Sequence, residues 1–182
     1  MMYYFFAASL PELRAGEAPP MSVGEFDEAA AGELSPAAWR RLTEFSLPSV
    51  PGGSAEGLPR VYREVRRFEE VLRTRIARRR ADRSGTLLEL PEPEEFVAEA
   101  ESAVAQAAQA ASPAEREEIL DRARAARLDE LESNHFFDFD FLCVYRLRLM
   151  LAERRRRRGS TERGRKNFEA ALREISEAAE CK

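Results

Sequence analysis

Residues 135–159, HFFDFDFLCVYRLRLMLAERRRRRG, form the stretch that decides the fold. Up to Leu151 its apolar residues cover nearly the whole circumference of a helix. A helix that is apolar all round is usually the buried centre of a bundle. The arginines at its end suit a helix C-terminus, where cations complement the helix dipole, and Gly159 is expected to end it. We therefore expect a central helix over 135–159 that other helices surround.

Start signals place further helices before and after this stretch. Ser22-Val23-Gly24-Glu25 matches a capping box, in which the first and fourth residues satisfy each other's backbone N–H groups. Ser35-Pro36 pairs an N-cap serine with proline at the first helical position. Ser112-Pro113-Ala114-Glu115 combines both features and is the clearest start in the chain. Ser160-Thr161 predicts the start of a last helix.

Two longer helices are expected in the middle of the chain. A stripe with helical spacing runs from Pro59 to about Arg83, where Ser84-Gly85 should end the helix. Its members are Val61, Val65, Phe68, Leu72 and Ile76. A second, alanine-rich helix is expected from Glu94 to about Ala111. Proline and glycine predict connections at 13–20, 46–57 and 87–93.

The first ten residues, Met1–Leu10, are apolar on all sides and end before Pro11. Periodicity cannot separate a buried strand from a buried helix in such a run. A strand would need a partner strand, and no other good strand occurs in the chain. We therefore expect a buried arm, either extended or helical.

Composition and element order together indicate the fold class. The chain has 182 residues, of which 44% are apolar, and it is rich in Ala, Glu, Arg and Leu, which are strong helix formers. We expect an all-α fold, a bundle of about six to seven helices. Residues 1–182 are predicted to form a single helical domain, with an N-terminal arm and short helices over 1–57 and a long-helix bundle over 58–182.

Charge and cysteine content exclude several functional classes. The net charge of −4 argues against a globally basic nucleic-acid-binding protein. The apolar runs are shorter than the roughly 20 residues that span a bilayer, and no basic segment precedes the first apolar run, as it would in a signal peptide. Two cysteines are too few for a disulfide scaffold. We expect a cytoplasmic protein.

No convergent catalytic set is visible in the sequence. His135, the only histidine, shares a helix face with Asp138, but Asp140 would be rotated away by about 200° on a continuous helix. We therefore expect these residues to cap the helix and not to bind metal. Cys143 lies in the apolar stretch and is expected to be buried and inert, and Cys181 is near the end of the chain. The glycines form no phosphate-binding fingerprint. We expect no catalytic residue, no cofactor and no metal.

Two arginine runs are candidate partner-binding sites: Arg78, Arg79 and Arg80, and Arg154, Arg155, Arg156, Arg157 and Arg158. Net charge alternates along the chain, with −5 over 1–57, +6 over 58–83, −9 over 84–133 and +5 over 134–165. One interpretation is that neighbouring helices attract each other across their exposed edges. The others are a solvated helix end, an acidic protein partner, or a nucleic acid.

Three segments carry a family resemblance: YYFFAASLPEL from Tyr3, MSVGEFDEAAAGELSPAAWRRL from Met21 and NHFFDFDFLCVYRLRLMLAERR from Asn134. In this order they resemble a short helical family that is encoded beside bacterial V/A-type ATPase subunits and has no assigned activity. The resemblance spans nearly the whole chain, and residues 50–112 depart from it. Its matching residues are Tyr3, Tyr4, Leu10, Pro11, Ser22, Phe26, Ser35, Pro36, Phe137, Asp138, Phe139, Asp140, Tyr145, Leu149 and Arg154.

That family is distantly similar to the C (or d) subunit of V/A-type ATPases, an all-helical funnel that joins the rotor ring to the central stalk. The resemblance implies a fold like that of this V-type ATPase component. It also implies a non-catalytic component, accessory or assembly factor whose partners are V/A-type ATPase subunits. The complex would place it peripherally at the membrane. The alternative is an arginine-rich helical module that binds an acidic polymer such as nucleic acid.

Overall fold

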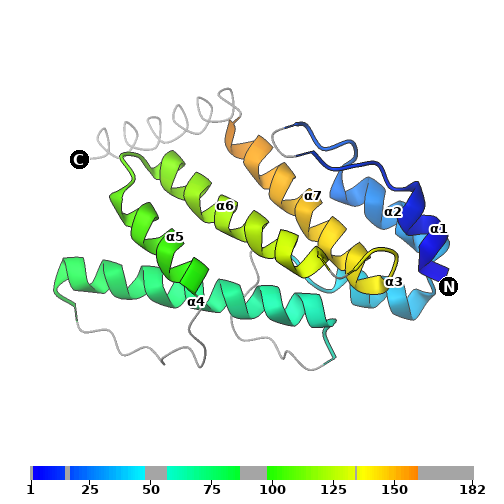
Figure 1. Ribbon diagram of the computed structural model, residues 1–182, viewed down its shortest axis with the longest axis horizontal. Helices are drawn as coiled ribbons and strands as arrows, with labels where there is room; N and C mark the ends of the chain where they lie inside the picture. The colour runs from blue at the N-terminus through cyan, green and yellow to red at the C-terminus, as the bar shows by residue number, and fades with distance from the viewer. Residues whose placement is uncertain (1, 15–16, 48–56, 87–97, 134, 160–182) are drawn as a thin grey trace, which may run out of the picture.

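The structure is a bundle of α-helices (Figure 1). The computed structural model describes residues 2–14, 17–47, 57–86, 98–133 and 135–159. Within these ranges every regular element is a helix, which confirms the expected all-α class. The helices are α1 (Met2–Ser9), α2 (Val23–Glu33), α3 (Pro36–Thr43), α4 (Arg60–Ser84), α5 (Ala98–Gln109), α6 (Pro113–Glu132) and α7 (Phe139–Gly159).

The helix starts predicted at Ser22, Ser35 and Ser112 are confirmed by their capping contacts. Ser22 Oγ accepts from the Glu25 N–H at 3.2 Å, and the Glu25 carboxylate accepts from the Ser22 N–H at 2.7 Å, which completes the box. Ser35 and Ser112 cap α3 and α6 by accepting from the N–H groups of Ala38 and Glu115. Gly85 ends α4 in the left-handed conformation, with φ 65°. The expected starts at Glu94 and Ser160 lie outside the described residues.

The start of α7 corrects the sequence prediction. The helix begins at Phe139 and not at residue 135. Asp138 Oδ1 accepts from the Phe141 N–H at 2.8 Å, the contact expected of an N-cap residue. The prediction of a buried central helix holds from Leu142 to Leu151, whereas Phe136 and Phe137 precede the helix and are exposed.

The N-terminal arm is the helix α1, and only one side of it is buried. Phe6 and Ala7 enter the core, and the Phe6 ring lies 5.7 Å from that of Phe26. Tyr4 and Phe5 are exposed. The expectation of an arm buried throughout is therefore wrong, because α1 packs on α2 and α7 along one face only.

The buried apolar residues form two clusters. The larger one, which we call the aromatic core, joins α1, α2, α3 and α7 to the first two turns of α4 and to Leu128 of α6. The smaller one, the alanine core, joins the middle of α4 to α5 and the start of α6. In Figure 1, α4 passes beneath α5, α6 and α7, so this one helix contributes side chains to both cores.

A buried ionic cluster lies between the two cores along both α4 and α6. Arg124 on α6 donates to both oxygens of Glu69 on α4, at 2.5 and 3.2 Å, and to Asp121 at 2.9 Å. Glu69 and Asp121 are almost completely buried. Arg154 and Arg158 of α7 also pair with Asp121, so three helices meet at these charges.

A second buried arginine fixes α7 against α2 and α3. Arg146 donates to both carboxylate oxygens of Asp27, at 2.8 and 3.0 Å, and to the Phe45 carbonyl at 2.5 Å. The carbonyl of Asp27 accepts from the Trp39 indole at 2.9 Å. A guanidinium with a carboxylate and a carbonyl is satisfied although it is buried. Arg146 therefore fixes the angle at which the short helices meet α7.

Candidate docking surfaces

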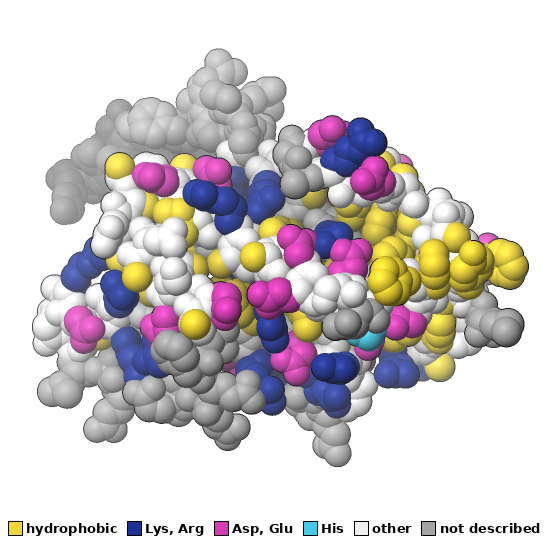
Figure 2. Space-filling model, in the orientation of Figure 1, with side chains coloured by type: hydrophobic (Ala, Val, Ile, Leu, Met, Phe, Trp, Pro, Cys, Tyr) yellow, Lys and Arg dark blue, Asp and Glu magenta, His cyan; other side chains and the backbone are white. Residues whose placement is uncertain are grey.

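Exposed aromatic side chains gather where α1 meets the start of α7. Tyr4, Phe5, Phe136 and Phe137 are 51, 78, 69 and 47% exposed, and we call these four residues the aromatic end. The Tyr4 ring lies 5.7 Å from Phe5 and 4.6 Å from Phe137. Figure 2 shows hydrophobic side chains collected on this end of the molecule. Two segments more than 130 residues apart therefore build one apolar surface.

The aromatic end rests on well-packed neighbours. Beneath it the Tyr3 and Phe139 rings are 5.5 Å apart, and the Arg41 guanidinium lies 5.4 Å from the centre of the Phe139 ring. With roughly 150–250 Å² for each fully counted ring, the four exposed fractions give on the order of 400–600 Å² of apolar surface. Patches of this size on a single protein are often functional.

His135 and the two aspartates after it come together beside the aromatic end. His135 Nδ1 lies 2.6 Å from Asp138 Oδ2, and His135 Nε2 lies 3.9 Å from Asp140 Oδ2. The sequence prediction placed Asp140 on the opposite face because it assumed a helix from residue 135. With the helix beginning at Phe139, that assumption is wrong. No group of three or more His, Cys, Asp or Glu in the described ranges is arranged to hold a metal ion.

Cys143 is buried in the aromatic core, as predicted. Burial raises the pKa of its thiol to about 12, an effect that a hydrogen bond with Tyr62 only partly offsets. Since the thiolate is the reactive form of cysteine, this side chain is unreactive near neutral pH.

Most arginines of the Arg154–Arg158 run contact groups within the protein, and one of them faces solvent. Arg154 donates to Glu117 at 2.7 Å, and Arg158 pairs with Glu117 at 3.2 Å and with Asp121. Arg157 pairs with Glu153 one turn earlier, at 3.0 Å. Arg155 donates to the Asp121 carbonyl at 2.9 Å. Among the described residues only Arg156 of this run has no partner.

The Arg78–Arg80 run lies on the last turns of α4, away from the aromatic end. Arg78 is half-buried, whereas Arg79 and Arg80 are exposed and have no ion-pair partner in the described part of the chain. Arg83 farther along donates to the Ala108 carbonyl at 3.1 Å. A partner-binding role for either run stays a prediction, and the structure does not bring the two runs together in a contact.

The charges that alternate in sign along the chain form ion pairs between adjacent helices. Arg75 of α4 pairs with Glu101 of α5, and Arg127 of α6 pairs with Glu64 of α4 at 3.1 Å. The Arg148 side chain of α7 contacts Asp129 at 2.5 Å and also Glu132, both on α6. The interpretation that neighbouring helices attract across their edges is confirmed for these three pairs of helices. It also explains why many arginines are not free to meet a partner.

The aromatic end was missed by reasoning from the sequence. The sequence predicts burial for both aromatic runs, 3–6 and 136–141, because an apolar run without a polar face carries no sign of which side is exposed. The one available signal was Asp138, whose side chain can end a run of apolar residues by capping the helix after it.

None of the described helices is both long and apolar enough to cross a membrane. Comparisons with protein-family models, with curated proteins and with solved structures found no match. Function therefore has to be inferred from the surfaces described above and from the residues that carry the family resemblance.

Proposed function

We propose that this protein is a non-catalytic component or accessory factor of a V/A-type ATPase, and that it docks on one of the ATPase subunits through the aromatic end. The proposal rests on one observation above all, the four aromatic side chains that stay exposed beside a filled core. Two of them, Tyr4 and Phe137, also belong to the motif that carries the family resemblance. Docking would place the protein on the cytoplasmic side of the complex.

Aromatic side chains are well suited to this role. Tyr and Phe are enriched at the centres of protein interfaces, where a few large side chains provide most of the binding energy. The contacts of Tyr4 with Phe5 and Phe137 hold these rings in place before a partner arrives. A partner therefore gains the apolar contact without having to order flexible side chains first.

An acidic polymer such as nucleic acid is the second candidate ligand, and it would use the arginine runs. Arg79 and Arg80 favour it, because they are exposed and unpaired among the described residues. The pairing of Arg154 and Arg158 with carboxylates speaks against it. Binding that depends on phosphate contacts would weaken steeply with salt, whereas docking through aromatic side chains would not.

Co-purification tests the two candidates against each other. The tagged full chain, expressed in its own host, should retain V/A-type ATPase subunits identified by mass spectrometry. The double variant Phe5→Ser/Phe136→Ser should lose them, because it removes the two most exposed rings. The double variant Arg79→Ser/Arg80→Ser is the matched control and should retain them.

The opposite pattern would contradict the proposal. Retention of the subunits by the aromatic variant, or their absence from the unaltered chain at low salt, would each exclude docking through the aromatic end. A gel shift of duplex DNA or RNA that weakens with salt and is lost in the arginine variant would favour the acidic-polymer candidate instead.

A further inference from the structure

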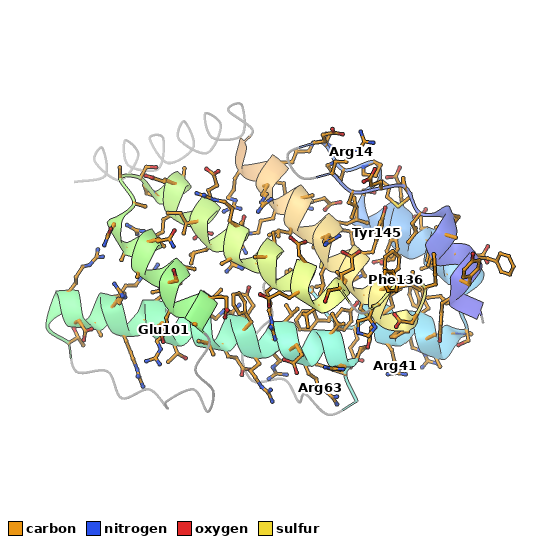
Figure 3. All side chains as sticks on the ribbon, viewed as in Figure 1. Arg14, Arg41, Arg63, Glu101, Phe136 and Tyr145 are labelled. Atoms are coloured by element: carbon orange, nitrogen blue, oxygen red, sulfur yellow. The ribbon has the colours of Figure 1, made fainter. Side chains whose placement is uncertain are left out.

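A cavity of about 600 Å³ lies between α6, α7 and the segment that precedes α2. Its apolar lining includes Leu13, Ala125, Leu151 and Ala152. Arg14 also lines the cavity, and Figure 3 shows it on the segment that passes beside α7. This volume lies within the 300–1,000 Å³ range usual for small-molecule sites. The aromatic end is on other residues, so a ligand here would be independent of docking.

Three arginines of α7 line one side of this cavity. They differ in how far nearby carboxylates neutralise their charges. Arg148 faces two carboxylates of α6, Asp129 and Glu132. Arg155 has only a neutral acceptor, the Asp121 carbonyl, and its Nε is buried with no hydrogen-bond partner among the described residues. Arg156 has no described partner and is exposed. Positive charge is therefore left over at one end of the cavity.

The surroundings of Arg155 compensate its charge only in part. Burial lowers the pKa of its guanidinium, the nearby charge of Glu118 raises it, and the charge of Arg122 lowers it again by a smaller amount. A partly desolvated guanidinium that pairs with no described carboxylate gains most from an anion that supplies several acceptor oxygens. The neighbours Arg154 and Arg158 differ, because both already pair with Glu117.

We propose that this cavity binds an amphiphilic small molecule with one anionic head, a carboxylate or a phosphate monoester. The head would contact Arg155 and Arg156, and the apolar body would lie on Leu13, Leu151 and Ala152. Glu17 and Asp129 also line the cavity. Their charges would repel a second anionic group, so a ligand with one head fits better than a polyanion.

Calorimetric titration of the intact chain tests this assignment, with decanoate and decyl phosphate as probes below the concentrations at which they form micelles. At least one should bind saturably with one site per chain. Decanol, which lacks the charge, and inorganic phosphate, which lacks the apolar body, should each bind at least tenfold more weakly. The better of the two charged probes identifies the head group.

Two variants and one control locate the site. Arg156→Gln should weaken binding about tenfold, and it should fold normally because Arg156 makes no described contact. Arg157→Gln is the matched control, since Arg157 pairs with Glu153 outside this cavity and its loss should leave binding unchanged. Ala152→Phe should reduce binding because the larger side chain fills part of the cavity, and this variant leaves every charged residue in place.

Three results would overturn the proposal. They are equal binding by Arg156→Gln and the unaltered chain, inorganic phosphate binding as tightly as decyl phosphate, and no saturable binding of either charged amphiphile. The second would mean an adventitious ion only.

Discussion

The two apolar cores of this protein are built from side chains of very different size. The aromatic core packs rings against one another, with Phe26 5.7 Å from Phe6 and 5.4 Å from Tyr145. The alanine core includes three alanines of α5, at 100, 103 and 107. Small side chains let helices approach closely but bury little apolar area per residue. The comparison indicates that stability is concentrated around α7 and is lower around α5.

The largest expected effect comes from removing a ring of the aromatic core. Phe26→Ala should lower the free energy of unfolding by about 4 kcal/mol, because Phe26 is fully buried and its neighbours cannot close the cavity. Ala103→Gly is the counterpart in the alanine core and should cost about 1–2 kcal/mol through one lost methyl group and a lower helix propensity. Urea denaturation measures both, and equal losses would refute the contrast.

The ionic cluster between the cores should give the next largest effect. Arg124→Met should cost about 3 kcal/mol, because it leaves Glu69 buried without its partner. The double variant Glu69→Met/Arg124→Met should be more stable than Arg124→Met alone, since both charges are then gone. Arg127→Met, one turn along α6, is the control and should cost less than about 1 kcal/mol because Arg127 is partly exposed. Additive losses in the double variant would mean that the pair is not coupled.

Thiol labelling compares how often the two cores open, with variants that should be almost as stable as the unaltered chain. In a Cys181→Ser background, Cys143 should resist alkylation at pH 8, because burial raises its pKa to about 12. Ala107→Cys, in a chain without the two natural cysteines, reports the alanine core and should react at least tenfold faster. Similar rates would show that the cores open together.

The same thiol also predicts a pH dependence. The folded state holds the Cys143 proton up to about pH 12, whereas an unfolded chain releases it near pH 9. The folded state therefore binds more protons in this window, and its stability should fall as the pH rises through it. Urea denaturation at pH 8 and pH 10.5, compared with a Cys143→Ala variant, isolates this contribution.

Helix starts could be predicted from the sequence because their signals are local. Ser22 with Glu25, and Ser112 with Glu115, satisfy backbone groups three residues away, so the pattern needs no tertiary information. The buried part of α7 could be predicted for a similar reason. Leu147 and Leu149 lie on different sides of the helix, and both are buried, as expected where apolar residues cover most of its circumference.

The surfaces could not be predicted, because they depend on contacts between distant segments. Phe5 and Phe6 are adjacent aromatic residues, yet one is exposed and the other buried, according to how α1 lies on α2. The same holds for Arg155 and Arg158, which differ by less than one turn but meet different groups of α6. Composition cannot distinguish such neighbours.

The helix α4 has a mechanical consequence that follows from its length. Its 25 residues span roughly 37 Å. Tyr62 near one end is fixed in the aromatic core, where its hydroxyl donates to the Leu42 carbonyl at 2.5 Å, while Leu72 is fixed in the alanine core. Glu69 lies between these two anchors and is held by Arg124 of α6. A rigid tilt of α4 about Glu69 would therefore move its end beside α3 and its end beside α5 in opposite directions.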